Sequence, residues 1–539
     1  MDSIGKLRRV SLAFATAIVL LTYSACLDAQ QTSSGNGQGS TPQVRMRWQD
    51  FISGPDGAKR LASLRTAVQK MKSLDNSPPE SADFRRSWKY WANIHGYLGP
   101  KSRFGTVAFQ IDRLKKIGYP QFIPYVQDIA DQAPPDSIAQ TVWATCEHSK
   151  SQTAQANFFG WHRMYLYYFE RVLRWAANDD TLRLPYWDYT DPAQTGLPDA
   201  FQDPNSVFYD WKRAQGLNEG SVVIDPKITN VDSDFAASDF FAFEWDVESG
   251  IHGNVHCAVG QTCPVAEMGL VPVAANDPIF YTHHANIDRL WACWENGSPT
   301  PGGPWQEQTF SFVDETGALK TGQVKDFLDT VALGYVYDNV SQCTRSKIVR
   351  TTMLQGTAPQ PAQGGEEKKY PVMLGSKKAI PITGAKTSVD IALPAKALHS
   401  LALSPAGSQT SELVLRDITA QSEPGTMLNV YVAKKGKPTA RQYVGTVNWF
   451  GAFEHHEAMD SPDRKTLQFD ITDQLRALGI ASATSGLTVT FEADNGRVAK
   501  NSSKAPALKA QAEPAVRSEA KVQIGAIEVR QAAVLPRKP

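Results

Sequence analysis

The 539-residue chain lacks an excess of either charge, and it lacks any apolar run long enough to cross a bilayer comfortably. Lys plus Arg and Asp plus Glu both number 55, which gives no electrostatic reason to expect a nucleic acid or an anionic membrane surface as a partner. The apolar run from Val10 to Leu21 is shorter than the ~20 residues that a spanning helix needs. The sequence also lacks an internal repeat. We therefore expect an ordinary globular protein, which at this length should have at least two domains.

The apolar run Val10–Leu21 follows a cluster of basic residues, which is the order found in an export signal. We expect this signal to occupy residues 1–29, with cleavage after Ala25 or Ala29. A pair of adjacent arginines in the basic cluster partly matches a twin-arginine signal, and a plain secretory signal is the alternative. The sequence therefore predicts an exported protein, periplasmic or secreted, with no membrane contact beyond export.

Cysteine is scarce, with six residues, and the sequence has neither a Cys-x-x-Cys pair nor a His-Glu-x-x-His zinc motif. Cys26 lies in the expected signal, where it leaves a lipoprotein signal open as an alternative. Five cysteines follow: Cys146, Cys257, Cys263, Cys293 and Cys343. An odd number in an exported protein calls for an explanation. Cys257 and Cys263 are close enough in sequence to pair, and Cys293 with Cys343 is a second candidate. Cys146 would then be left over, two residues before His148.

The composition divides the rest of the chain into four parts. Residues 30–41 are rich in Ser, Gly and Gln and predict a flexible leader. Residues 42–355 are rich in aromatic residues and show helical periodicity in several runs, which predicts a mainly helical domain. The expected helices are Leu61–Met71, Phe84–Ile94, Trp161–Trp175 and His284–Trp294. Residues 356–369 form a composition break and are the expected linker.

Residues 370–539 change to short alternating runs separated by polar turns. The expected strands are Val389–Ala392, Glu412–Leu415, Met427–Val432, Gln442–Val447, Leu467–Ile471, Leu487–Glu492 and Gln523–Val529. Seven such runs predict an antiparallel, all-β sandwich as the C-terminal domain.

Seven of the ten histidines lie in the helical domain: His95, His148, His162, His252, His256, His283 and His284. His252 and His256 are four residues apart, so they share one helix face and suit two ligands of one metal. His284, expected at the start of the next helix, supplies a third imidazole. His95, His148 and His162 form another set of three imidazoles, and His162 is expected at the start of a helical run. A single buried histidine is commonly a hydrogen-bonded core residue, but six at such positions favour two imidazole sites for copper, zinc, iron or nickel.

Three segments identify a family. Trp161–Arg171, His252–His256 and Asp277–Trp291 resemble the copper-binding signatures of tyrosinases, catechol oxidases and molluscan-type haemocyanins. The tyrosine pair in Gly334–Tyr337 resembles the end of the catalytic core in polyphenol oxidases. Phe469-Asp470-Ile471 resembles a signature of the β-domain that follows this core in many of them. The resemblance extends from about Arg45 to Tyr337, and the position of Phe469-Asp470-Ile471 after this core supports the C-terminal match.

This resemblance implies a helical-bundle core with two copper ions in residues 42–355. It assigns His95, His148 and His162 to the first copper, and His252, His256 and His284 to the second. His283 is then a neighbouring residue and no ligand. In several family members a Cys-x-His unit carries a thioether, which would join Cys146 to His148 and explain the odd cysteine. His148 and His162 lie 14 positions apart, wider than is usual in the family, so we expect either an inserted loop within Ser149–Ala156 or a displaced His148.

The resemblance also implies an activity. Members of the family use dioxygen as co-substrate and oxidise small phenols: they convert o-diphenols to o-quinones, and some also hydroxylate monophenols. Haemocyanins bind dioxygen reversibly at the same copper pair, so an oxygen carrier is the alternative. A single core behind an export signal favours the enzyme.

Four further positions are implied to shape the reaction. Glu248 resembles the glutamate that holds a water and serves as base, although a surface or helix-capping carboxylate is the alternative. Gly253 stands where an asparagine is associated with phenol hydroxylation, so diphenol oxidation is the safer expectation. Val271 resembles the gate position and predicts an open site. Phe280 would lie against a ligand imidazole, or be plain core.

The C-terminal domain is expected to pack over the copper site as a self-shielding lid. Trp449–Phe453 is the candidate covering loop. The alternative is that this domain only stabilises the helical core.

Overall fold

The computed structural model describes residues 41–116, 118–149, 156–237, 239–261, 263, 267–296, 300–340, 372–393, 409–452, 465–479, 486–500 and 514–533. From Gln43 onward these residues belong to one compact unit. The expected signal, most of the leader and the linker at 356–369 lie outside the described residues, so the domain boundaries stay predictions. Among the described helices, none combines the length and the apolar character of a membrane-spanning segment.

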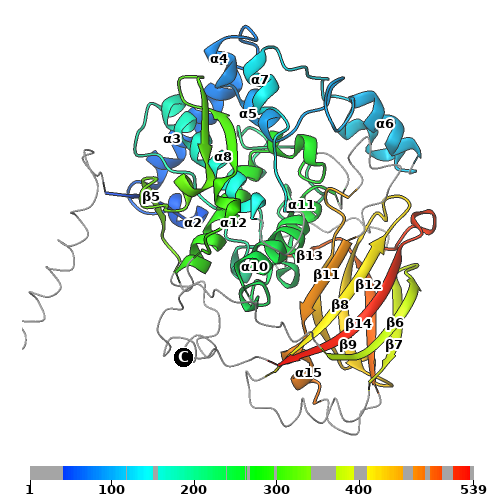
Figure 1. Ribbon diagram of the computed structural model, residues 1–539. Coiled ribbons are helices and arrows are strands. Elements are labelled where there is room, and N and C mark those ends of the chain that lie inside the picture. Colours follow the sequence, from blue (N-terminus) through cyan, green and yellow to red (C-terminus); the bar gives the residue numbers. More distant parts are fainter. Residues whose placement is uncertain are drawn as a thin grey trace, which may run out of the picture. The chain divides into compact units, whose positions relative to one another are not determined.

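The N-terminal part is mainly helical, as the periodicity predicts (Figure 1). Its helices are α2 (Trp48–Phe51), α3 (Gly57–Ser73), α4 (Ala82–Arg85), α5 (Trp88–His95), α6 (Val107–Lys116), α7 (Ser137–Val142), α8 (Asn157–Ala177), α9 (Asp199–Gln202), α10 (Phe240–Val247), α11 (Gly253–Val259) and α12 (Ile279–Glu295). Short strands accompany them: β1 (Gln43–Arg45), β2 (Val222–Ile224), β3 (Thr309–Val313), β4 (Leu319–Gln323) and β5 (Tyr335–Tyr337).

Two expectations about these helices are wrong in detail. The single helix expected at Phe84–Ile94 is two helices, because Ser87 interrupts it and caps α5 by accepting a hydrogen bond from the Tyr90 backbone N–H. His162 and His284 do not open their helices. Helix α8 begins at Asn157 and α12 at Ile279, so each histidine lies in the second turn, where the backbone is fixed on both sides.

Aromatic side chains fill the core between the long helices. Phe169 of α8 stacks on Tyr281 of α12 with ring centroids 3.7 Å apart, and Trp91 of α5 packs on the same α8 face against Tyr165 at 5.5 Å. Such rings bury large areas in fixed orientations, and a dense interior transmits any shift to its neighbours. The three helices that carry His95, His162 and His284 are therefore held rigidly against one another.

The C-terminal part is an antiparallel sandwich, as predicted (Figure 1). Its described strands are β6 (Val372–Pro381), β7 (Lys386–Ala392), β8 (Gln409–Thr419), β9 (Met427–Lys434), β10 (Arg441–Val447), β11 (Lys465–Asp470), β12 (Gly486–Asp494), β13 (Arg497–Ala499) and β14 (Gln523–Ala533), and the short helix α15 (Thr472–Ala477) follows β11. One sheet has the order β10-β9-β12-β7 and the other β11-β8-β14-β6, with every neighbouring pair antiparallel.

The sandwich core follows from residue alternation. Leu487, Val489 and Phe491 alternate along β12 and are all buried in one apolar cluster, since every second side chain of a strand points to the same face. Two described strands of the C-terminal part were not predicted from the sequence, β6 and β13. Strand β13 pairs antiparallel with β2 of the helical part, with Val498 opposite Val223, so the two parts are joined by backbone hydrogen bonds.

Candidate metal centre

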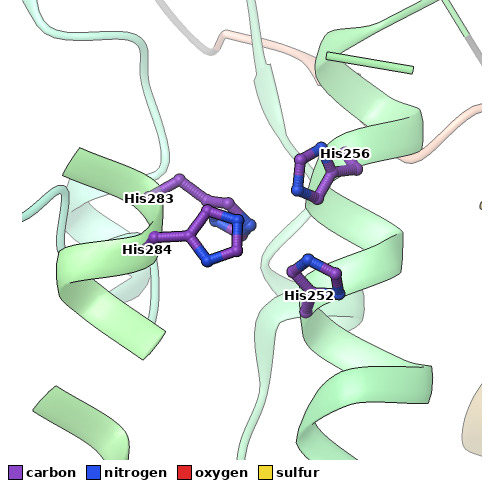
Figure 2. A group of neighbouring side chains, drawn as sticks. All are labelled: His252, His256, His283 and His284. Atoms are coloured by element: carbon purple, nitrogen blue, oxygen red, sulfur yellow. The ribbon is translucent and has the colours of Figure 1, made fainter. Parts of the chain in front are cut away.

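Four buried histidines meet between helices α11 and α12. His252 and His256 extend from one side, and His283 and His284 from the other (Figure 2). One ring nitrogen from each lies within 4.8 Å of all the others. The π-helical turn η5 (Glu248–His252) precedes α11 and places His252 beside His256, with ring centroids 4.6 Å apart. The prediction that His252, His256 and His284 lie together is consistent with this arrangement.

Backbone carbonyls fix the proton position on four of the predicted ligands. Nδ1 of His256 lies 2.7 Å from the Met268 carbonyl oxygen, and Nδ1 of His252 lies 3.2 Å from that of Glu248. His162 and His95 are held in the same way, by Phe158 at 2.8 Å and Val271 at 3.1 Å. A carbonyl only accepts, so each Nδ1 carries the proton. Each Nε2 therefore keeps the lone pair that a metal requires.

We call the four histidines between α11 and α12 the second cluster. Among the described residues, no hydrogen-bond donor binds their Nε2 lone pairs. The Nε2 atoms of His252, His256, His283 and His284 are buried and have no hydrogen-bond partner. Burial, followed by the neighbouring imidazoles, lowers the pKa of each of these four histidines well below the ordinary value. Orphaned buried polar atoms are costly. Neutral imidazoles with free lone pairs fit a metal ion.

His283 differs from its neighbour. Its Nδ1 lies 2.8 Å from the hydroxyl of buried Tyr189, a side-chain partner, whereas neither ring nitrogen of His284 has a partner. The His284 ring stacks on that of His162 with centroids 4.3 Å apart and planes 4° from parallel, which places it between the two clusters. The assignment of His284 as ligand and His283 as neighbour stays a prediction.

The first cluster contains His95, His162 and the sulfur of Cys146, all buried. Sγ lies 3.6 Å from Nε2 of His162 and 3.6 Å from Nε2 of His148. Burial raises the pKa of the Cys146 thiol, but the surrounding imidazoles of His95, His148 and His162 outweigh it and bring the pKa well below the ordinary value. An activated sulfur against the His148 ring is the arrangement expected for a thioether between them.

His148 is the most exposed of the predicted ligands, with 38% of its side chain accessible. Glu248 orients it: one carboxylate oxygen lies 2.7 Å from His148 Nδ1, and the other accepts from the Ser149 backbone N–H at 3.0 Å. Such a carboxylate–imidazole pair fixes the ring and raises its basicity toward a metal. Glu248 therefore contacts a predicted ligand directly, and its role as a base stays a prediction. Most of the expected loop after Ser149 lies outside the described residues.

The predicted pocket residues lie around these clusters. The Phe280 ring packs 4.2 Å from that of His284 and 4.8 Å from that of His95. Val271 is 3% exposed, and Gly451 of the C-terminal part packs over it. Gly253 is buried in the first turn of α11. Their roles in substrate selection stay predictions.

A buried ionic network that the sequence reading missed ties the metal-bearing helices together. Asp288 lies one turn after His284, and its Oδ1 accepts from Nε of Arg163 at 2.6 Å. Its Oδ2 accepts from Arg45 at 3.1 Å and from the hydroxyls of Tyr335 and Tyr337 at 2.8 and 2.7 Å. The available signal was Arg163 directly after His162 and Asp288 one turn after His284, both in largely apolar runs, because buried charges need partners.

The cysteine pairing is partly settled. Cys257 and Cys263 form the expected disulfide, directly after His256. Cys293 is also disulfide-bonded, and its expected partner Cys343 lies outside the described residues. Cys146 forms no disulfide, and its thioether to His148 stays a prediction.

Family comparisons match the region that carries both clusters. A family model for the common central domain of tyrosinase matches residues 85–238 and 227–297, and one for the polyphenol oxidase middle domain matches residues 304–347. The chain is 31% identical over 261 residues to polyphenol oxidase A1 of Vicia faba, covering 40% of this chain and 42% of that protein. It is 30% identical over 309 residues to a tyrosinase of Hahella sp. (strain CCB-MM4), covering 50% and 59%. It thus spans about half the length of these relatives.

The whole fold has a counterpart among solved structures. The structure of a latent aurone synthase (polyphenol oxidase) superimposes with a TM-score of 0.54 at 18% identity, covering 94% of this chain and 92% of that chain. At this identity the likeness concerns the fold alone. It extends over the helical part and the β-sandwich together.

Proposed function

The chain belongs to the tyrosinase and polyphenol oxidase family, and from this premise we propose that it is a dicopper oxidase that converts o-diphenols to o-quinones with dioxygen. The observation that carries this proposal is the pair of adjacent, buried imidazole clusters. In the second, three predicted ligands present unpartnered Nε2 atoms toward one another. The donor set is almost purely imidazole, which suits copper.

The protein's own residues would hold the metals and exclude water. Two copper ions bound by the six histidines would supply the redox chemistry, passing two electrons from a diphenol to dioxygen. The carbonyls of Val271, Phe158 and Met268 keep Nδ1 protonated, which leaves Nε2 as the nitrogen that would bind an ion. Phe280 forms an apolar wall behind His284. Glu248 holds His148, and in this proposal its carboxylate also accepts the phenolic proton.

Diphenols are the better substrates in this proposal. Gly253 has no side chain with which to orient a water. The neighbouring Asn254 is engaged elsewhere, since its Nδ2 donates to the Ile228 carbonyl at 3.2 Å and its Oδ1 accepts from Asn448 at 2.9 Å. Proton transfer from a monophenol would therefore lack the amide that assists it in hydroxylating relatives.

The C-terminal part serves as a lid in this proposal. Phe450 stacks on the His256 ring with centroids 4.0 Å apart and planes 13° from parallel, and it meets His252 edge-on at 5.5 Å. A phenol that approached the second metal would need the same space. The expected covering loop, Trp449–Phe453, contains this residue. Phe453, the last residue of this loop, lies outside the described residues.

An oxygen-uptake assay with a matched pair of substrates tests the proposed reaction. Copper-loaded, full-length Phe450→Ala should consume oxygen and form quinone with 4-methylcatechol, and it should act far more slowly on 4-methylphenol, which lacks only one hydroxyl. Intact protein should be less active than this variant if the lid blocks access. Equal rates on the two substrates would contradict the diphenol preference, and equal rates for the two proteins would contradict the lid.

Export is part of the proposal and rests on the basic and apolar N-terminal sequence. Protein recovered from outside the cytoplasm should begin after Ala25 or Ala29, as read by mass spectrometry of the intact chain. Recovery of the unprocessed chain from the cytoplasm alone would contradict it.

A further inference from the structure

The turn that leads into helix α11 has an unusual backbone. Residues Glu248–His252 form a π-helical turn, and α11 follows directly. Such turns are rare and concentrate at functional sites because they disturb the regular hydrogen bonding of a helix. Here the carbonyls of Glu248, Ser249 and Gly250 all receive donors from side chains. Nδ1 of His252 donates to the Glu248 carbonyl. The carbonyls of Ser249 and Gly250 accept from a side chain of the β-sandwich.

Asn448 provides those donors. It follows β10, is 2% exposed, and its Nδ2 donates to the carbonyls of Ser249 at 2.8 Å and Gly250 at 3.3 Å. The same amide donates to Oδ1 of Asn254 in α11 at 2.9 Å. Its Oδ1 accepts from the Phe450 backbone N–H at 3.3 Å. One buried side chain thus connects the π turn, the ligand helix and the loop that covers His256.

Gly253 makes this contact possible. A Cβ at this position would lie 2.5 Å from Oδ1 of Asn448 and 2.9 Å from its Nδ2, closer than real side chains approach. Any larger residue would push Asn448 away from the turn. The glycine next to His252 is therefore required by the close approach of the amide, irrespective of its backbone angles.

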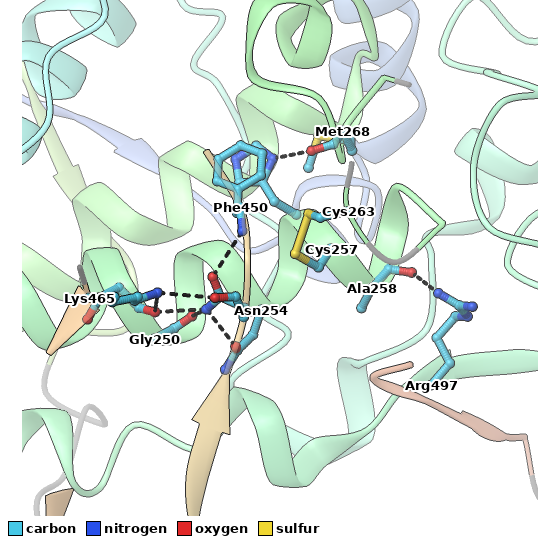
Figure 3. Close-up of a disulfide and its surroundings, with 12 residues drawn as sticks. Gly250, Asn254, Cys257, Ala258, Cys263, Met268, Phe450, Lys465 and Arg497 are labelled. Carbon is cyan, nitrogen blue, oxygen red and sulfur yellow. Dashed lines mark hydrogen bonds between the residues drawn. A yellow bond between two sulfur atoms is a disulfide. The ribbon is translucent and has the colours of Figure 1, made fainter. Parts of the chain in front are cut away.

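The β-sandwich also holds the other end of α11. Nη1 of Arg497 donates to the carbonyl of Ala258, in the last turn of the helix, at 2.6 Å (Figure 3). Arg497 begins β13, which pairs with β2 of the helical part. At the first end, Nζ of Lys465 lies 3.4 Å from the Ser249 carbonyl and 3.3 Å from that of Asn448. The helix that carries His252 and His256 is thus clamped at both ends by the C-terminal part.

We propose that Asn448 is a positioning residue for the second metal: by holding the π turn at Ser249 and Gly250, it keeps His252 and His256 aimed at one ion. The C-terminal part is then a structural support of the metal centre as well as its cover. This inference rests on the proposed dicopper function. It predicts that loosening the C-terminal part at Asn448 weakens one metal site, whereas removing the lid residue Phe450 does not.

Copper retention separates these two roles. Full-length protein is loaded with two equivalents of copper and exposed to a chelator, and copper release is followed for Asn448→Ala, Asn448→Asp and Phe450→Ala. Asn448→Asp keeps the side-chain volume and the acceptor for the Phe450 N–H but loses the donors. Both Asn448 variants should bind one copper about 10-fold more weakly than the unchanged protein and release it correspondingly faster. This is the lower end of the range for direct partners of metal ligands, because Asn448 acts through the turn. Phe450→Ala should retain both ions.

Electron paramagnetic resonance supplies a readout that a general loss of stability would not move. The paired copper(II) ions are silent, so selective loss of one ion should produce a signal from the isolated copper that remains. Uniform loss of both ions, or wild-type release rates with no signal in both Asn448 variants, would overturn the proposal. If the unchanged protein fails to bind two coppers, the dicopper function itself fails, which is a distinguishable result.

Gly253→Ala tests the same contact from the helical side. Alone it should release copper as Asn448→Ala does, because its new Cβ displaces the amide. The double variant Gly253→Ala/Asn448→Ala should be no worse than Asn448→Ala alone, because the shorter side chain removes the clash. Additive effects of the two substitutions would contradict the proposed contact.

Discussion

Replacing Asp288 by Asn should destabilise the protein and loosen the metal centre. The carboxylate is 3% exposed and accepts four hydrogen bonds, two from the guanidinium groups of Arg45 and Arg163 and two from tyrosine hydroxyls. The substituted amide has nearly the same shape, but it carries no charge and presents N–H groups toward donors. Two arginines that are almost fully buried would lose a counter-ion.

The magnitude follows from what remains beside each arginine. Removing one partner of a buried ion pair costs about 3–5 kcal/mol. Arg45 keeps Glu170 at 2.8 Å, and Arg163 keeps Glu295 at 3.6 Å, so neither is left without a counter-ion. We therefore expect the lower end, about 3 kcal/mol. A unit of about 500 residues has an unfolding entropy of about 1 kcal/mol/K, so this loss corresponds to a melting temperature lower by about 3 °C.

Thermal unfolding of the metal-free protein measures this effect, with Asp473→Asn as the matched control. Asp473 pairs with Arg476 on the surface and is 90% exposed, so the control should change stability by less than about 0.5 kcal/mol. Burial opposes ionisation, but Arg163 and Arg45 hold the pKa of Asp288 below the ordinary value of 3.8. Its stabilisation is thus complete above about pH 4 and is lost as pH falls further. A melting temperature for Asp288→Asn equal to that of the control at pH 7 would refute the reasoning.

Three further changes have defined outcomes. Acid should strip copper. The buried ligands, such as His256, have pKa values well below that of an unfolded histidine, so the unfolded state binds more protons than the folded state. The metal-bound fold therefore weakens as pH drops below about 6.5, and full copper retention near pH 4 would count against imidazole ligation. Val271→Phe in a Phe450→Ala background should reduce turnover of bulky diphenols more than of catechol, and an equal loss would contradict the gate. A thioether between Cys146 and His148 would lower the mass of the intact chain by two hydrogens relative to the mass expected from the sequence. Cys146→Ser should remove this deficit, and a deficit of the same size in the variant would contradict the thioether.

Local patterns in the sequence predicted what depends on neighbours along the chain. Helical periodicity located α8 and α12, and alternation located seven of the sandwich strands, because each pattern reflects one buried face of a regular element. The spacing of His252 and His256 predicted that their rings lie side by side, and it was sufficient because the π-helical turn that carries His252 continues directly into α11, which carries His256. The disulfide between Cys257 and Cys263 followed from proximity in the same way.

Contacts between distant segments could not be read from the sequence. Asn448 lies about two hundred residues from the turn that it holds, and Arg497 is equally remote from Ala258. Neither has a local pattern, since a buried amide and a helix-capping arginine look like surface residues when taken alone. Gly253 was interpreted through the missing side chain beside His252. Its packing against Asn448 is visible only in three dimensions.

Oxygen consumption by copper-loaded Phe450→Ala with 4-methylcatechol tests the dicopper assignment most directly. Two coppers held by the six histidines should consume one dioxygen for every two quinones formed, and His284→Ala should lose this activity together with one copper. Reversible oxygen binding without quinone would identify a carrier instead. Full activity after removal of all copper would contradict the assignment.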